Sequence, residues 1–289
     1  MYALENYHPF VLFFYFITVV CLTMFFMHPV LLFVSLLASF VLFTAMRGLR
    51  GVGFSAVFFL VVALINPFFS HNGVTPLLFI NGNPITLEAL VYGIFMGMLL
   101  LSTLYWLRSF HTLMTEDKIM ALFSGVFPKL ALLLSMILHF VPQLVKKGKA
   151  IYAAQKALGA WENAKHFKAH KLWIAVLSAL LTQALESAID TADSMRARGY
   201  AAAKRRSACP CKFRGKDMAL LVCILLLAGC FLFFAWTGRT TFYFYPRISQ
   251  IDLSPAAIFM YIAYALLMFM PVIILVKGEI RWKYLQSGI

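Results

Sequence analysis

Six long apolar stretches constrain this chain more than any other feature of its sequence. They cover residues 10–27, 29–46, 52–69, 86–107, 218–237 and 255–276. A helix needs about 20 consecutive apolar residues to cross a hydrocarbon core roughly 30 Å thick, because its backbone must satisfy its own hydrogen bonds there. The stretches therefore predict an all-α fold, a polytopic membrane helix bundle with about six spans.

Composition excludes a soluble globular domain. Of the 289 residues, 62% are hydrophobic and only 12% are charged, whereas a soluble domain contains about 25% charged residues. The first apolar stretch is expected to be retained as a span. The only charge before it is Glu5, and a secretory signal peptide would begin with basic residues.

The distribution of charge predicts the orientation. Segment 108–216 contains 18 Lys/Arg and 6 Asp/Glu, out of 25 and 11 in the whole chain. Loops rich in Lys and Arg stay in the cytoplasm, which places the uncharged loop 70–85 outside. We therefore predict a multi-pass protein of the cell membrane with both termini in the cytoplasm. Its parts would be a bundle of four spans (1–107), a basic cytoplasmic coupling domain (108–216), and a two-span hairpin with a cytoplasmic tail (217–289).

The sequence also admits eight spans. Residues 127–145 and 172–189 are nearly apolar enough to cross as a hairpin, and this would leave the other orientations unchanged. Lys129, Pro142 and the basic run at 146–149 favour an interfacial or cytoplasmic placement instead. Six spans are therefore preferred.

The basic segment predicts two long amphipathic helices. From Lys171, apolar residues recur every three or four positions, with no Gly or Pro before Gly199. At 1.5 Å per residue this helix would be about 40 Å long, and Gly199 would end it in the left-handed conformation. The other helix is expected to run from Pro128 to Gly159 with a kink at Pro142. Two such helices indicate a docking surface for an acidic partner, although basic cytoplasmic loops commonly only set topology and touch anionic lipid.

The end of the second helix carries a resemblance to a known family. Residues 184–200 (ALESAIDTADSMRARGY) resemble the Ala-Arg-Gly signature of the transmembrane T component of energy-coupling factor (ECF) transporters, which are vitamin and metal importers related to ABC transporters. The similarity covers roughly residues 85–237, and before that it rests on hydropathy and on Asn66-Pro67. It extends to Ile85–Leu90 (ITLEAL), Pro142, Ala154–Gly159 (AQKALG), Arg205-Arg206 and Asp217.

The resemblance implies the partners. A T component joins two cytoplasmic ABC-type ATPase subunits to a separate membrane subunit, the S component, which binds the substrate. Its two coupling helices sit on the ATPases, and the motif arginine enters an acidic groove in one of them. By position, Arg198 would be that arginine; alternatively, Arg198 merely interacts with a helix C-terminus. The other implied coupling residues are Ala197, Gly199, Ala157 and Gly159, with Arg196 and Gln155 as secondary candidates. Leu158 stands where the first motif would have an arginine.

The implied role is mechanical and non-catalytic. No phosphate-binding loop with the Gly and Ser/Thr spacing of a nucleotide site occurs in the sequence. ATP and Mg²⁺ are therefore expected on the partner ATPases, with no cofactor in this chain and no nucleic-acid partner. An autonomous permease or channel is the alternative. It is disfavoured because the spans contain almost no ionisable residue beyond Glu88.

Two sets of possible metal ligands are weighed against simpler roles. Glu162, His166 and His170 follow a four-residue spacing that would align them on a helix. Lysines 165, 168 and 171 crowd the same stretch and would repel a cation. Cys209 and Cys211 have no second pair of ligands. The preferred interpretation is that neither set binds a metal.

Overall fold

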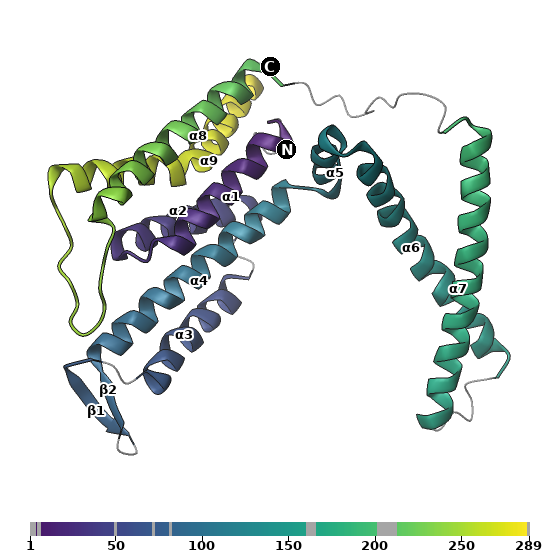
Figure 1. The fold of residues 1–289 in the computed structure, drawn as a ribbon, viewed down its shortest axis with the longest axis horizontal. Helices are drawn as coiled ribbons and strands as arrows, with labels where there is room; N and C mark the ends of the chain where they lie inside the picture. Colours follow the sequence, from purple (N-terminus) through teal and green to yellow (C-terminus); the bar gives the residue numbers. More distant parts are fainter. Residues whose placement is uncertain are drawn as a thin grey trace. The chain divides into compact units, whose positions relative to one another are not determined.

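The computed structural model describes residues 4, 7–48, 51–70, 73–80, 83–159, 166–200 and 213–287. The chain divides into two compact units, one formed by residues 1–118 and 211–289 and the other by residues 119–210 (Figure 1). The boundary between them falls within α5 (Glu116–Val126).

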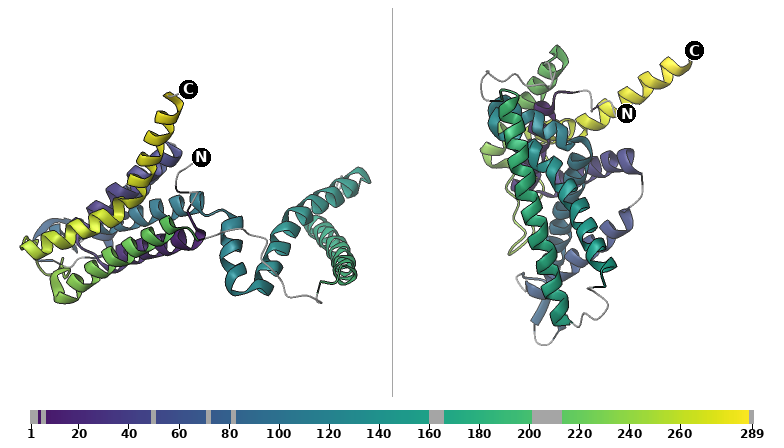
Figure 2. Two further views of the ribbon diagram at one scale, coloured as in Figure 1. Left: turned by 90° about the horizontal axis from the view of Figure 1, so that it is seen from above. Right: turned by 90° about the vertical axis from the view of Figure 1, so that its right-hand side faces the viewer.

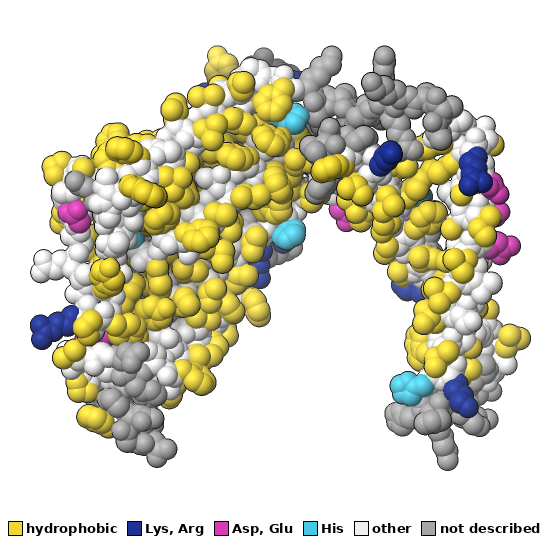
Figure 3. All heavy atoms as spheres, viewed as in Figure 1, with side chains coloured by type: hydrophobic (Ala, Val, Ile, Leu, Met, Phe, Trp, Pro, Cys, Tyr) yellow, Lys and Arg dark blue, Asp and Glu magenta, His cyan; other side chains and the backbone are white. Residues whose placement is uncertain are grey.

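In its described residues, the first unit is a bundle of six long helices, which confirms the predicted all-α polytopic fold. Its helices are α1 (Pro9–Phe25), α2 (Pro29–Arg47), α3 (Val52–Phe69), α4 (Leu87–Leu113), α8 (Gly215–Phe234) and α9 (Pro255–Ser287), and a π-helical turn (Ala235–Arg239) follows α8. The central helix is α4, which packs against α1, α2 and α3, while α9 packs against α2 and α8. Figure 3 shows apolar side chains over most of the visible face of this bundle, as lipid contact requires.

Proline positions set two of the helix starts. Pro9 and Pro29 occupy the first turns of α1 and α2, where the missing N–H is not needed and the fixed φ suits a helix. Seven helices in the described ranges are long and apolar enough to cross a membrane, and α1 is a shorter apolar helix of 17 residues. The seven include both long helices of the second unit, so length and composition also allow eight spans, and six spans stay a prediction.

Polar side chains join α1, α2 and α4 inside the bundle. The Ser35 hydroxyl lies 2.7 Å from the Ser102 hydroxyl and 3.0 Å from that of Thr23, and it accepts a 3.1 Å hydrogen bond from the Trp106 indole. All four side chains are fully buried. Because hydrocarbon offers no alternative partners, such bonds add to helix association in a membrane.

Tyr15 of α1 compensates for a proline in α9. Pro271 lies inside α9 and has no N–H, so the carbonyl of Leu267, four residues earlier, loses its helical donor. The buried Tyr15 hydroxyl donates a 3.1 Å hydrogen bond to that carbonyl. The bond links the first helix to the last at a place where an unpaired carbonyl would be costly.

Close packing of α3 on α4 depends on two glycines. A Cβ at Gly93 would lie 2.5 Å from the Ala63 carbonyl oxygen, and one at Gly97 would lie 2.9 Å from the Phe59 ring. Ala63 lies four residues before Pro67, so the proline removes the helical donor of that same carbonyl. The Asn66 amide reaches across to donate to the Ala89 carbonyl at 3.0 Å. The Asn66-Pro67 pair thus shapes the α3–α4 contact.

A short β-hairpin connects α3 to α4, and the sequence analysis did not predict it. Strand β1 (Pro76–Ile80) pairs antiparallel with β2 (Asn83–Thr86). Buried Glu88, in the first turn of α4, accepts a 2.8 Å hydrogen bond from the Thr75 hydroxyl. Gly73 has φ +145°, and a Cβ there would lie 2.6 Å from a Glu88 oxygen. Glu88 therefore anchors the hairpin to α4.

The second unit contains a long antiparallel helical hairpin, α6 (Pro128–Ala157) and α7 (His166–Ala197). Helix α7 crosses the C-terminal half of α6 (Figure 1; Figure 2 gives two further views of the hairpin). The Lys147 ammonium donates a 2.8 Å hydrogen bond to the Ser187 hydroxyl, and the Tyr152 and Trp173 rings stack 5.5 Å apart. Both predicted helices are present, although α7 begins five residues before Lys171. Helix α6 continues through Pro142, and the kink there stays a prediction.

Candidate functional site

The predicted motif Ala197-Arg198-Gly199 forms the C-terminal cap of α7. Gly199 has φ +72°, its N–H bonds to the Arg196 carbonyl at 2.9 Å, and the Tyr200 N–H bonds to the Met195 carbonyl at 3.1 Å. These two bonds define a Schellman motif, which favours glycine because the left-handed conformation strains other residues. The predicted left-handed end is confirmed, and Arg198 lies at the turn where the helix stops.

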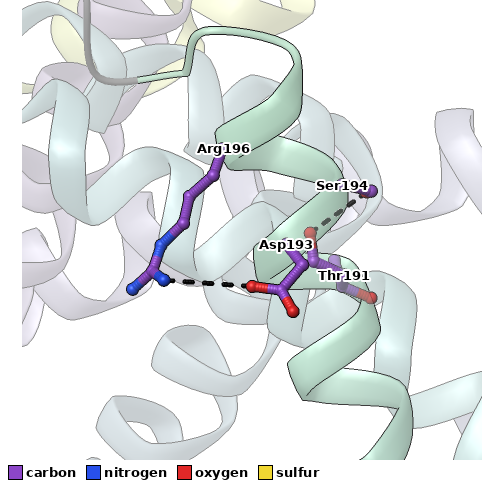
Figure 4. Close-up of polar contacts among 4 residues, drawn as sticks. All are labelled: Thr191, Asp193, Ser194 and Arg196. Carbon is purple, nitrogen blue, oxygen red and sulfur yellow. Dashed lines mark hydrogen bonds and ion pairs between the residues drawn. The ribbon is translucent and has the colours of Figure 1, made fainter.

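Arg196 and Arg198 differ in their surroundings. The Arg196 guanidinium lies 3.9 Å from the Asp193 carboxylate, one turn earlier on the same helix (Figure 4). Both side chains are largely exposed, so the pair adds little stability. Arg198 is exposed at the very end of the helix. Among the described residues of this helix end, Arg196 is the arginine with a carboxylate partner and Arg198 has none.

The end of α6 shares the left-handed glycine and one of the two capping hydrogen bonds, with different side chains. Gly159 has φ +74°, and its N–H bonds to the Lys156 carbonyl at 3.0 Å. Leu158 takes the position that Arg198 takes in α7, and its side chain is 84% exposed. Ala157 is exposed as well, whereas Gln155 is partly covered and its side-chain oxygen is buried without a hydrogen-bond partner.

The antiparallel hairpin keeps these two helix ends far apart. Because α6 and α7 run in opposite directions, their C-termini lie at opposite ends of the hairpin (Figure 1). A helix of 30 residues such as α6 is about 45 Å long. The structure therefore brings Ala197, Arg198 and Gly199 together, and Ala157 and Gly159 together, but it does not join the two sets into one site. The arrangement offers two separate contact points.

Basic charge gathers at the α7 end. Arg196 and Arg198 lie where the helix dipole is negative, which favours cations. Figure 3 shows Lys/Arg side chains beside Asp/Glu side chains on this part of α7. Asp190 and Asp193 supply carboxylates in the preceding turns, and both are exposed. The two arginines therefore lie nearer the end of the helix than the two aspartates do.

The sequence analysis missed how the helices contact each other at their crossing. A cavity of about 110 Å³ lies between them. It is lined by Phe140, Gln143, Leu144, Lys147, Ala184, Ser187 and Ala188. The four-residue spacing of Ala184 and Ala188 was the available signal for a helix contact, but the partners come from 40 residues away. The residue pattern of α7 alone does not identify these partners on α6.

Outside the crossing, both helices expose an apolar face. On α7 its members recur every four residues, at Leu177, Leu181, Leu185 and Ile189, with exposed fractions from 54% to 67%. On α6 they are Leu133, Ile137, Val141 and Val145. Such a face requires lipid or an apolar protein surface against it.

The possible metal ligands lie partly outside the described residues. Glu162, Cys209 and Cys211 are in that part, His166 begins α7, and His170 follows it by about one turn. Within the described ranges, no group of three His, Cys, Asp or Glu side chains is close enough to hold a metal ion. The described structure thus adds no support for a metal site.

Comparison with known proteins identifies the family. The family model described as "Cobalt transport protein" (CbiQ) matches residues 7–208, a span that contains α1–α4 and the α6–α7 hairpin. The energy-coupling factor transporter transmembrane protein EcfT of Listeria innocua is 30% identical over 190 residues, which cover 61% of this chain and 72% of that protein. The chain belongs to this family of ECF transporter T components. The T component of Bacillus selenitireducens, also named EcfT, is 35% identical over 107 residues, which cover 35% of this chain and 38% of that protein.

Membership in the family shows which kind of protein carries the candidate site. A T component is a multi-pass membrane subunit of a transporter, and the apolar helices of the bundle agree with this. The matched residues 7–208 include both capped helix ends, so the candidate site lies within the part of the T component that defines the family.

Proposed function

We propose that this T component is the scaffold and energy transducer of an ECF-type importer for a micronutrient, a vitamin or a metal ion. It would couple ATP hydrolysis by two cytoplasmic ATPase subunits to reorientation of an S component that binds the substrate. ATP and Mg²⁺ would be bound by the ATPases, and the chain itself would be non-catalytic. The main support is that the hairpin presents two exposed, glycine-capped helix ends at its opposite ends.

The two ends suit two ATPase subunits. A guanidinium offers a rigid fork of donors to carboxylates and keeps its charge on partial burial. Arg198 would enter an acidic groove, with Ala197 and Gly199 small enough to let the helix end approach closely. The α6 end, with Ala157, Leu158 and Gly159, would meet the second subunit at about a helix length away.

The crossing of α6 and α7 would transmit the movement. When ATP closes the ATPase pair, the distance between the two helix ends changes, and the crossing angle must follow. The cavity between the helices leaves room for such a change, while the Lys147–Ser187 hydrogen bond holds the crossing point. The exposed apolar face of the hairpin would pass the movement to the S component, whose surface must be apolar to cover it.

Orientation follows from this proposal. The ATPases are cytoplasmic, so the basic hairpin would lie on the cytoplasmic side, together with both termini. Anionic lipid would meet the surrounding basic residues, as the distribution of Lys and Arg predicts.

Affinity purification of the tagged chain in mild detergent, followed by mass spectrometry, tests the assembly. Two ABC-type ATPases and a small apolar membrane protein should co-purify, and the ligand of that small protein would identify the substrate. A chain that purifies alone, under conditions that preserve other membrane complexes, would instead favour an autonomous permease or channel.

A pair of charge reversals tests the role of Arg198. Arg198→Glu should abolish retention of one ATPase and substrate uptake, because a carboxylate would then face an acidic groove. Arg196→Glu makes the same charge change two residues away, at a side chain that already pairs with Asp193, and should have a smaller effect. Normal ATPase activity and full uptake in the Arg198→Glu complex would refute the proposed coupling.

A further inference from the structure

Arg108 of α4 belongs to the first unit, the helix bundle, and takes no part in the proposed coupling. Its guanidinium carbon lies 5.9 Å from the centre of the Phe43 ring and 6.0 Å from that of Phe54, and one of its nitrogens donates to the Ser55 hydroxyl at 3.4 Å. The side chain is half-buried between α2, α3 and α4. Within the described residues no carboxylate pairs with it.

The length of α4 places Arg108 at a membrane boundary. Helix α4 begins at Leu87, next to the outer β-hairpin, and Arg108 follows 21 residues later. At 1.5 Å per residue this is about 32 Å, close to the thickness of a hydrocarbon core. If Leu87 marks the outer boundary, the guanidinium reaches the level of the lipid phosphates on the opposite side.

The neighbouring residues suit a lipid at this level. Phe54 and Leu107, which flank Arg108, are 67% and 44% exposed, so an acyl chain can lie against them. Arg47, in the last turn of α2, is exposed and follows by one helical turn Phe43, whose ring contacts the Arg108 guanidinium, so it adds a second positive charge. Gly51 follows with φ +95°, and a Cβ there would lie 3.7 Å from an Arg108 nitrogen.

The Arg108 guanidinium lies near two aromatic rings and has no carboxylate partner among the described residues, so an anion from outside the chain would complete the site. A guanidinium has five N–H donors, and Ser55 engages one nitrogen. The oxygens of a phosphate group match the geometry of the remaining N–H donors, and the two rings fix the plane of the guanidinium. A carboxylate of the protein would be the usual partner at a partly buried site, and here the described chain supplies none.

We propose that Arg108 binds the phosphate of an anionic phospholipid of the cytoplasmic leaflet, with Arg47 as the nearby charge and Phe54 as contact for the lipid. The side of the membrane rests on the orientation given under the proposed function. The binding itself does not, because it can be measured on the isolated chain without ATPases or an S component.

Native mass spectrometry of the purified full chain tests the proposal. The chain in neutral detergent is titrated with phosphatidylglycerol or with phosphatidylcholine of the same acyl chains. The wild-type chain should prefer phosphatidylglycerol, and Arg108→Gln should weaken that binding by about tenfold, the usual weight of a charge-assisted hydrogen bond. Arg247→Gln removes the same charge from an exposed position on the loop after α8 and should leave binding unchanged.

A second variant keeps the proposal testable if the Arg108→Gln chain does not fold. Phe54→Leu keeps every charge and alters an exposed ring, and it should weaken phosphatidylglycerol binding roughly two- to fivefold through the lost cation–π contact. Unchanged binding in Arg108→Gln, or in Phe54→Leu if Arg108→Gln does not fold, would overturn the proposal. Equal losses in Arg108→Gln and Arg247→Gln would overturn it as well. So would displacement of the lipid from the wild-type chain by millimolar inorganic phosphate, since the site would then take a small anion.

Discussion

The Tyr15 hydroxyl bonds to the backbone of α9, at 3.1 Å to the Leu267 carbonyl and at 3.4 Å to the Met268 carbonyl, and it offers a clear test at the scale of one residue. Tyr15→Phe removes the donor to the Leu267 carbonyl, which Pro271 already deprives of its helical partner. The unpaired carbonyl should cost about 1–3 kcal/mol of unfolding free energy. Unfolding of the purified chain in detergent measures this. Tyr243→Phe, at an exposed tyrosine, is the control and should change little.

His28, between α1 and α2, predicts a pH dependence of stability. Its side chain is 2% exposed, its ring lies 5.4 Å from that of Tyr261 and 5.5 Å from that of Phe242, and its Nε2 lies 3.3 Å from the Tyr261 hydroxyl. Burial lowers the pKa of His28 below its usual value of 6.5. The unfolded chain therefore binds a proton at higher pH than the folded one, and stability falls as pH drops below about 6.5.

The variant His28→Gln isolates this contribution. It removes the titrating group at a position where a polar side chain can still reach the Tyr261 hydroxyl. The melting temperature of the wild-type chain should decrease between about pH 7.5 and 5.5, and the variant should lose less over the same interval. Parallel decreases in both chains would show that other groups dominate.

Single residues also show what sequence patterns can and cannot predict. Gly199 was predictable, because glycine followed the last position of a helical pattern and φ +72° requires it. The bond between Tyr15 and Leu267 was not, since it joins residues 252 positions apart. The pairing of Arg196 with Asp193 was partly predictable, because a three-residue spacing on a helix allows the contact without requiring it.

At the scale of elements, the α3–α4 contact makes a prediction about glycine. Gly93→Ala would place a methyl group 2.5 Å from the Ala63 carbonyl oxygen, a backbone atom that cannot move without shifting α3. Overpacking of this kind costs about 1–3 kcal/mol, and thermal unfolding should reveal it. Gly229→Ala in α8 is the matched control, because no neighbouring atom lies within 4 Å of the added methyl group. Equal stability of the two variants would contradict the close approach.

The spans were predictable as elements, whereas their contacts were not. Apolar length alone indicates α2, α3, α8 and α9, because the bilayer imposes that length on any helix that crosses it. The β-hairpin at residues 76–86 was missed because it lies outside the apolar stretches and is held by Glu88, which the sequence analysis noted only as an isolated charge. The α6–α7 crossing was missed because amphipathic periodicity identifies a face without naming what covers it.

At the scale of the whole molecule, the difference between the two helix ends proposed to contact the ATPases has the largest functional consequence. The ends share a glycine-terminated backbone, but one carries Arg198 and the other Leu158. If both proposed ATPase contacts were acidic grooves, the α6 end would offer its groove no guanidinium. An exposed leucine at that tip instead suits an apolar acceptor. The asymmetry therefore predicts that the two ATPase subunits are bound through unlike contacts.

Leu158→Arg decides between these possibilities. The leucine is 84% exposed, so an arginine fits without repacking, and it would recreate at α6 the arrangement found at Arg198. An acidic groove at the second ATPase would make that subunit dissociate about tenfold more slowly, as expected for a new charge-assisted contact. Leu158→Gln controls for lost apolar area without adding charge. Timed dissociation of the purified complex gives the rates. If Leu158→Arg and Leu158→Gln both release the subunit faster, the second contact is apolar, and the T component distinguishes its two ATPases by the chemistry of its helix ends.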